Sequence, residues 1–130
     1  MRVYNKWHSM IKQELKKMNL THPQFVVLAS LAYLSQNGNE EITQVMISKL
    51  AGIDVMTVSQ ILNLLEKNDF VKRKEHSRDT RAKAVILNKK GEKVLQKAVP
   101  LVEQIDEIFF GKLDTDEEQF KHFLVRLNEE

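Results

Sequence analysis

The chain has 130 residues, of which 42% are hydrophobic and 29% are charged, with a formal net charge of +2 and no cysteine. This length and composition fit one compact domain over residues 1–130 and exclude disordered, collagen-like and disulfide-rich proteins. A chain without cysteine also has no thiolate catalysis, cysteine-based redox sensing or thiolate metal site.

The longest nearly apolar stretch, from Phe25 to Leu34, has about half of the ~20 residues that a membrane-spanning helix needs. The N-terminal segment shows neither a secretory signal nor a lipidation motif. We therefore expect a cytoplasmic protein with no membrane partner.

The first 38 residues predict two helices. Apolar residues recur at steps of three and four from Val3 to about Met18, which indicates an amphipathic helix. Thr21 and Gln24 have the spacing of a capping box, in which each side chain accepts from the backbone amide of the other residue. A second helix is therefore expected from this point to the turn at Gly38.

Residues 43–68 predict two short helices joined by a tight turn. Thr43 is a suitable N-cap for the first helix, which ends at Gly52, and Asp54 is a suitable N-cap for the second. The second helix, expected over residues 54–68, carries an apolar stripe for burial: Val58, Ile61, Leu62 and Leu65. Two such helices joined by a glycine-containing turn form the helix-turn-helix pattern.

A short β-hairpin is predicted directly after these helices. Asn68 and Asp69 tolerate the left-handed backbone that ends a helix. The segments 70–75 and 84–87 are typical of two antiparallel strands, joined by a polar, turn-prone tip over residues 76–81. The expected fold class is therefore mainly α with a small β-hairpin wing, that is, a winged helix-turn-helix.

Two further helices are expected after the hairpin, one from an Asn88 cap to Gly111 and one that starts at Asp114 or Thr115. Together they hold more apolar side chains than a small monomer easily buries: Ile108, Phe109, Phe110, Phe120, Phe123 and Leu127. This excess favours a homodimer.

The charges are unevenly distributed. Between Lys72 and Lys93 nine basic residues oppose three acidic ones, whereas between Glu103 and Glu130 three basic residues oppose nine acidic ones. Such asymmetry directs one end of the molecule toward a polyanion. The alternative interpretation is a chance cluster on a solvated face.

The candidate base-reading surface is the side of the helix 54–68 that lies opposite the buried stripe. At 100° per residue, this side and its flanks carry Val55, Met56, Thr57, Ser59, Gln60, Asn63 and Lys67. Glutamine and asparagine pair bidentately with adenine, hydroxyl groups pair with several bases, and Met56 or Val55 suits a thymine methyl group. The alternative is an ordinary solvated helix face.

The hairpin supplies the other candidate contacts. Arg78 and Arg81 at the tip suit a narrow, A·T-rich minor groove. Phosphate would repel Asp79, so we expect Asp79 to orient Arg81 or to close the turn, the alternative being a plain turn aspartate. Five lysines are expected to contact phosphates, which adds affinity without specificity: Lys72, Lys74, Lys83, Lys89 and Lys90.

These motifs resemble the MarR family of bacterial transcription regulators. The resemblance rests on the residues from Asp54 to Gln60, on Leu65-Glu66-Lys67, on the wing from Arg78 to Lys83 and on Lys90-Gly91-Glu92. It covers nearly the whole chain, and Asp79 with Arg81 at this distance from a helix-turn-helix is its most specific part. Asn68-Asp69 replaces the glycine common in the family, and the first helix is short for the family.

The resemblance implies a DNA-binding lobe over about residues 20–88 and a homodimer held by helices within residues 1–19 and 89–130. It further implies a pseudo-palindromic site in double-stranded DNA and release by a small-molecule effector. A family-like effector pocket would include Trp7, Ile11 and Phe25, although residues at such helical spacing are more often simple core.

The sequence therefore predicts a sequence-specific DNA-binding transcriptional regulator, with repression released by an effector as the expected form. A non-sequence-specific DNA-binding or protein-interaction module is the alternative, although a recognition face that is polar rather than basic argues against it. No residue pattern indicates an enzyme or a cofactor. The histidines (His8, His22, His76 and His122) are scattered and lack the spacing of a helical metal site.

Overall fold

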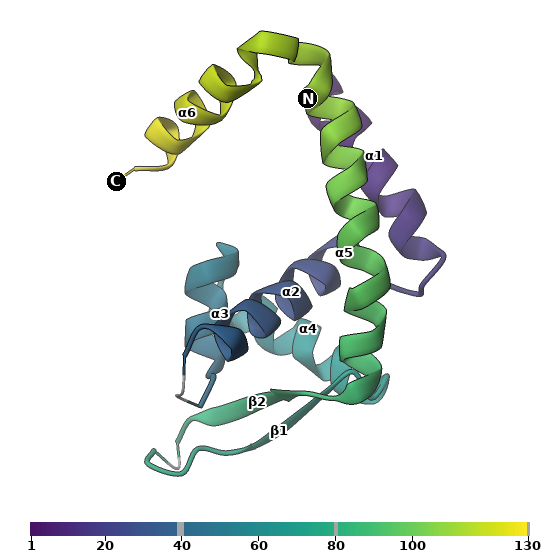
Figure 1. Cartoon of the computed structure of the whole chain (residues 1–130). Helices are drawn as coiled ribbons and strands as arrows, with labels where there is room; N and C mark the ends of the chain where they lie inside the picture. Colours follow the sequence, from purple (N-terminus) through teal and green to yellow (C-terminus); the bar gives the residue numbers. More distant parts are fainter. Residues whose placement is uncertain (39–40, 80, 130) are drawn as a thin grey trace.

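The computed structural model describes residues 1–38, 41–79 and 81–129 and shows a mainly helical chain with a two-stranded sheet (Figure 1). In chain order the elements are α1 (Arg2–Lys16), α2 (His22–Gln36), α3 (Gln44–Ala51), α4 (Val55–Lys67), β1 (Val71–Glu75), β2 (Lys83–Leu87), α5 (Lys89–Phe110), the 3₁₀ helix η1 (Gly111–Asp116) and α6 (Glu117–Asn128). The predicted winged helix-turn-helix is confirmed. Thr80 of the wing motif and Glu130 at the C-terminal end lie outside the described residues.

Side-chain caps set the starts of α2, α3 and α4, as predicted. Oγ1 of Thr21 accepts from the amide of Gln24 at 3.2 Å, and Oε1 of Gln24 accepts from the amide of Thr21 at 3.1 Å. Thr43 and Asp54 accept from backbone amides three residues further on, at 3.3 and 3.2 Å. Gly52 ends α3 with a φ of 70°, a left-handed conformation that glycine adopts without steric cost.

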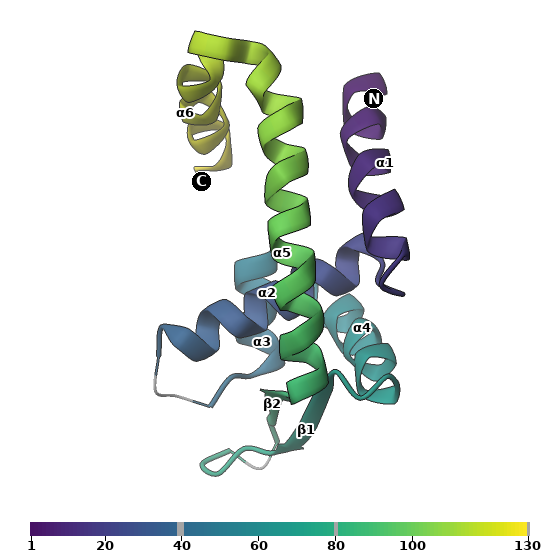
Figure 2. The same ribbon diagram turned by 45° about the vertical axis from the view of Figure 1, so that its right-hand side comes forward.

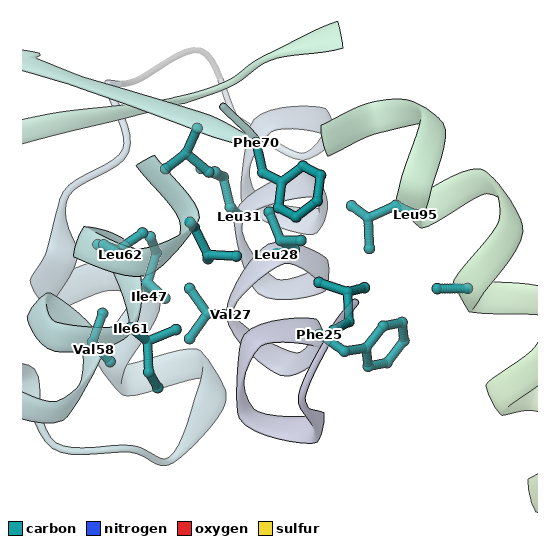
Figure 3. Close-up of a cluster of buried hydrophobic side chains, with 14 of the residues drawn as sticks. Phe25, Val27, Leu28, Leu31, Ile47, Val58, Ile61, Leu62, Phe70 and Leu95 are labelled. Carbon is teal, nitrogen blue, oxygen red and sulfur yellow. The ribbon is translucent and has the colours of Figure 1, made fainter. Parts of the chain in front are cut away.

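Helix α2 is the centre of the hydrophobic core (Figure 3). Its residues Val27, Leu28 and Leu31 are fully buried. Side chains of α3 and α4 meet them on one side, and Leu95 of α5 lies on the other side; the labelled contributors from α3 and α4 are Ile47, Val58, Ile61 and Leu62. Burial of each large apolar side chain contributes about 1.5–3 kcal/mol, so this packing fixes α4 relative to the rest of the molecule.

The wing is a regular antiparallel hairpin that is anchored at its base. Val71 lies opposite Leu87, and Glu75 lies opposite Lys83. Asp69, with a φ of 63°, is the left-handed residue expected after α4. A Cβ atom on Gly91 would lie only 2.3 Å from the carbonyl oxygen of Phe70, so a side chain there would displace the start of α5 from the wing.

One predicted helix start is confirmed and one is wrong. Helix α5 starts directly after its N-cap residue Asn88, as predicted, although the Asn88 side chain makes no capping hydrogen bond; its Nδ2 donates to the backbone and side-chain oxygens of Asp69, at 3.3 and 3.1 Å. The last helix begins at Glu117 rather than at Asp114 or Thr115, because Asp114 has a φ of 52° that interrupts the helical backbone. The predicted end of α5 at Gly111 is confirmed.

The first and last helices flank the long helix α5 differently (Figure 2). Helix α1 packs against α5, whereas α6 stands away from α2, α3 and α4 in both views. Helix α6 buries none of its residues, and Phe123, Leu124 and Leu127 have exposed fractions of 45%, 46% and 82%. The apolar excess noted in the sequence therefore lies on the surface of the single chain.

Among the described residues, no single helix is long and apolar enough to cross a membrane, and α3 with α4 meets that test only as a pair bent by 110°. Within the same ranges, no three His, Cys, Asp or Glu side chains are grouped so as to hold a metal ion.

Candidate nucleic-acid interface

The outer side of α4 is exposed, and it carries the residues that the sequence selected. The apolar stripe of α4 is buried, whereas Met56 has an exposed fraction of 72% and Val55 one of 41%. Gln60 and Asn63 are exposed, and Thr57 and Ser59 are half-buried. Helix α4 and the hairpin lie at the end of the molecule away from both termini (Figures 1 and 2).

The hydroxyl of Thr57 is engaged within the helix. Besides capping the amide of Thr57, Asp54 accepts a hydrogen bond from its Oγ1. These two hydrogen bonds hold the pKa of Asp54 below its ordinary value, so the carboxylate is kept charged. Thr57 therefore keeps acceptor capacity and its methyl group for a base edge, while its proton points to Asp54.

Arg73 of β1 ties the wing to α4 and α3. Its guanidinium donates to Oε1 of Glu66 at 3.1 Å, to Oε1 of Gln44 at 3.1 Å and to Oδ1 of Asn63. Its backbone amide also donates to Oε2 of Glu66 at 3.2 Å, and these bonds lower the pKa of Glu66. The side chain of Arg73 is only 17% exposed, so this contact is packed between elements.

This network changes the expected role of Asn63. Its carbonyl oxygen accepts from Arg73, so the amide NH₂ group is what it can present to DNA. Bidentate pairing with adenine needs both the donor and the acceptor, so it requires the Arg73 contact to be given up. Sequence reasoning counted Arg73 only as part of the basic run; its position two residues after the buried Val71 was the signal that it faces α4.

Asp79 both orients Arg81 and closes the turn, which joins the two roles proposed for it. Its Oδ1 accepts from the backbone amide of Arg81 at 3.1 Å and from Nε of Arg81 at 3.3 Å. Its carbonyl oxygen accepts from the amide of Ala82 at 3.0 Å. The side chain of Arg81 is 91% exposed, and Arg78 and Lys83 are also exposed.

A second tether holds the wing tip to the residues before α3. The backbone amide of Ser77 donates to the two carboxylate oxygens of Glu41 at 3.3 and 3.2 Å, and its hydroxyl donates to Oε1. The hydrogen bonds from Ser77 lower the pKa of Glu41. No sequence pattern indicated this pair, because 36 residues separate its members.

The expected phosphate contacts differ in their surroundings. Lys72, Lys74 and Lys89 are exposed. Lys90 is exposed too, but its Nζ lies 5.3 Å from the ring centroid of Phe70, within the range of a cation–π interaction.

The three residues chosen for an effector pocket lie apart from the large hollow that the structure shows. Ile11 and Phe25 belong to the hydrophobic core, and Nε1 of the half-buried Trp7 donates to Oδ1 of Asp106 at 2.8 Å. The hollow lies between α2, β2 and α5 and has a volume of about 1040 Å³, and none of the three residues lines it.

Two histidines that seemed scattered in the sequence are in contact. Nδ1 of His8 lies 3.0 Å from Nδ1 of His22, and the ring of Trp7 meets His22 edge-on at a centroid distance of 5.5 Å. Burial lowers the pKa of His22, the charge of His8 lowers it further, and Asp106 opposes both effects. The pair lies where α1 meets the start of α2.

A helix-turn-helix with an exposed polar face, followed by a hairpin tipped with arginines, defines a winged-helix DNA-binding protein. A family model described as "ArnR1-like, winged-helix domain" matches residues 16–105. The HTH-type transcriptional regulator YdcH of Bacillus subtilis is 34% identical over 105 residues, which cover 81% of this chain and 71% of that protein. The chain belongs to the MarR family of winged-helix transcriptional regulators, which are not enzymes.

Two solved structures support the same assignment. Staphylococcus aureus MepR in complex with DNA has a TM-score of 0.86 at 25% identity, covering 97% of this chain and 90% of that one. Bordetella bronchiseptica BpsR, whose DNA binding is regulated by 6-hydroxynicotinic acid, has a TM-score of 0.79 at 27% identity, covering 96% of this chain and 91% of that one.

Proposed function

We propose that this chain is a homodimeric, cytoplasmic repressor that binds a pseudo-palindromic site in double-stranded DNA and is released by a small molecule. The observation that carries the proposal is the exposed outer side of α4, held next to an arginine-tipped wing by Arg73. The solved MepR complex with DNA supports this use of the fold.

In this proposal α4 enters the major groove. Gln60 pairs with a base edge, Met56 and Val55 contact thymine methyl groups, and Ser59, Thr57 and Asn63 add single hydrogen bonds. Arg78 and Arg81 enter the adjoining minor groove, and Lys83 binds phosphate. In a dimer the two α4 helices would occupy successive major grooves about 34 Å apart.

Dimerisation and release rest on different observations. The exposed apolar side chains of α6 supply a surface for a second copy. Release by a small molecule is supported by BpsR, whose DNA binding responds to 6-hydroxynicotinic acid. Of the three pocket residues expected from the family, only Trp7 has a partly accessible side chain, and Ile11 and Phe25 are buried in the core.

Selection of bound sites from a random duplex pool tests the function. Enrichment of a palindrome with two half-sites about one helical turn apart supports a sequence-specific dimer. Binding without enrichment would support the alternative, a non-sequence-specific module that keeps the winged-helix shape. The selected duplex then serves for reporter assays that measure repression.

A further inference from the structure

The hollow between α2, β2 and α5 has apolar walls and an acidic lining. Its volume is about 1040 Å³, slightly above the usual upper size of pockets that hold small molecules, about 1,000 Å³. The apolar walls come from Ala29, Ala32, Val85, Leu95 and Val99. Tyr33, Ser35, Gln36 and Gln96 add hydrogen-bonding groups.

Its charged residues all have the same sign. Glu41, Glu92 and Glu103 line the hollow, and none of the described residues that line it is Lys, Arg or His. Three carboxylates beside apolar walls attract a bound cation and repel a bound anion. The charge complementarity therefore selects an organic cation with an apolar body.

Glu41 connects this hollow to the wing. Its carboxylate oxygens accept from the amide and hydroxyl of Ser77, near the tip that carries Arg78 and Arg81. The chain next to it is tied to β2, because the amide of Val85 donates to the carbonyl oxygen of Ile42 at 2.8 Å. Glu41 is thus part of the hollow's lining and also of the contact that holds the wing tip.

We propose that this hollow binds an amphipathic organic cation, such as an aryl amidinium, and that the bound cation pairs with Glu41 in competition with Ser77. Loss of the Ser77 contact frees the wing tip and lowers the affinity for DNA. By linkage, bound DNA must weaken the binding of the cation by the same factor. The regulatory half of this inference rests on the proposed DNA-binding function, whereas the binding half does not.

Calorimetric titration of the DNA-free protein tests the binding half. The probes are benzamidine and benzoate, which share one ring and carry opposite charges. We expect benzamidine to bind and benzoate not to bind, with Glu103→Gln weakening benzamidine roughly fivefold or more. Glu107→Gln, one helical turn further along α5 and outside the lining, is the matched control and should bind as the wild type does. Equal binding of benzoate, or no effect of Glu103→Gln, would overturn the proposal.

The regulatory half is tested with the selected duplex at a fixed benzamidine concentration. Glu41→Gln can still accept from Ser77 but offers no charge to the cation, so its DNA affinity should fall less than that of the wild type. Wild type and variant are compared at the same benzamidine concentration, so any effect of benzamidine on the DNA is the same for both proteins. If wild type and variant respond equally, the coupling is wrong. If no site is enriched in the selection, the DNA-binding proposal fails while the calorimetric result stands.

Discussion

The guanidinium of Arg73 in β1 donates to the side-chain oxygen of Asn63 in α4, ten residues earlier in the chain. The same group binds Glu66 and Gln44, so one side chain joins the recognition helix, the wing and the first helix of the helix-turn-helix. In the proposed complex with DNA, the wing and α4 enter neighbouring grooves and must keep a fixed relative position. Arg73 supplies that constraint from inside the protein.

Replacement of Arg73 by Ala should therefore weaken both the fold and the reading of DNA. Hydrogen bonds to a charged group contribute about 1.5–3 kcal/mol to stability. In the variant, water can bind Asn63 and Glu66 in place of the guanidinium, so we expect the unfolding free energy to fall by about 1–3 kcal/mol. Urea denaturation measures it. Preference for the selected site over random duplex should also decline.

Lys72→Ala is the matched control for this change, because Lys72 is exposed on the other side of β1. It should leave the stability unchanged and lower DNA affinity equally for all sequences. A stable Arg73→Ala variant with full site preference would contradict the positioning role.

Arg81→Ala should weaken DNA binding by about 1–3 kcal/mol, most strongly on A·T-rich flanks. The Arg81 side chain is 91% exposed and Asp79 orients it, so its removal should leave the fold intact. Asp79→Asn keeps an acceptor for the amide of Arg81 and should cost less. Competition binding on duplexes with A·T-rich or G·C-rich flanks measures both variants, and equal losses on the two flanks would argue against a minor-groove contact.

Most of the fold was predictable because its signals are local. The capping box at Thr21, the N-caps Thr43 and Asp54 and the left-handed Asp69 each act over a few residues, and each is present. The buried stripe of α4 follows from helical periodicity alone.

What the sequence did not predict depends on contacts between distant segments. Asn88 is the N-cap residue of α5, as expected, but its side chain bonds Asp69, 19 positions earlier, and no amide of the helix. The contacts of Arg73 with Gln44 and of Ser77 with Glu41 join residues 29 and 36 positions apart. A single sequence gives residue types at each such position but no evidence of which pairs meet.

The two lysines at the start of α5 should differ in their effect on salt dependence. Loss of one phosphate contact lowers the slope of log affinity against log salt by about 0.9. We expect this for Lys89→Ala, whose side chain is exposed. Lys90 already lies over Phe70, so Lys90→Ala should change the slope less and also lower stability by roughly 0.5–1 kcal/mol. Binding titrations at several salt concentrations distinguish the two, and identical slopes for both variants and the wild type would remove these lysines from the interface.

Leu124→Glu should convert the proposed dimer to monomers without unfolding the chain. Leu124 is 46% exposed on a helix that buries no residue within the protomer, so a charge there is tolerated until a second copy covers it. Gln119→Glu adds the same charge about 140° around the helix and is the control. Sedimentation at micromolar concentration measures the state, and a monomeric wild type would contradict the dimer itself.

Stability should fall as the pH is lowered through 6.5, the ordinary pKa of histidine, because of His22. Burial and the facing His8 lower the pKa of His22 in the folded chain, while Asp106 offsets part of that effect. The unfolded chain therefore takes up the proton first as the pH falls, which favours unfolding. The stabilisation is complete above pH 6.5 and is lost progressively below it.

His22→Gln should flatten this pH dependence, and His8→Gln should flatten it partly, since burial of His22 remains. His122, exposed on α6, supplies the control variant His122→Gln, which should keep the wild-type profile. Urea midpoints between about pH 5 and pH 8 provide the measurement. If the His22→Gln variant loses stability as steeply as the wild type, a group other than His22 causes the pH dependence.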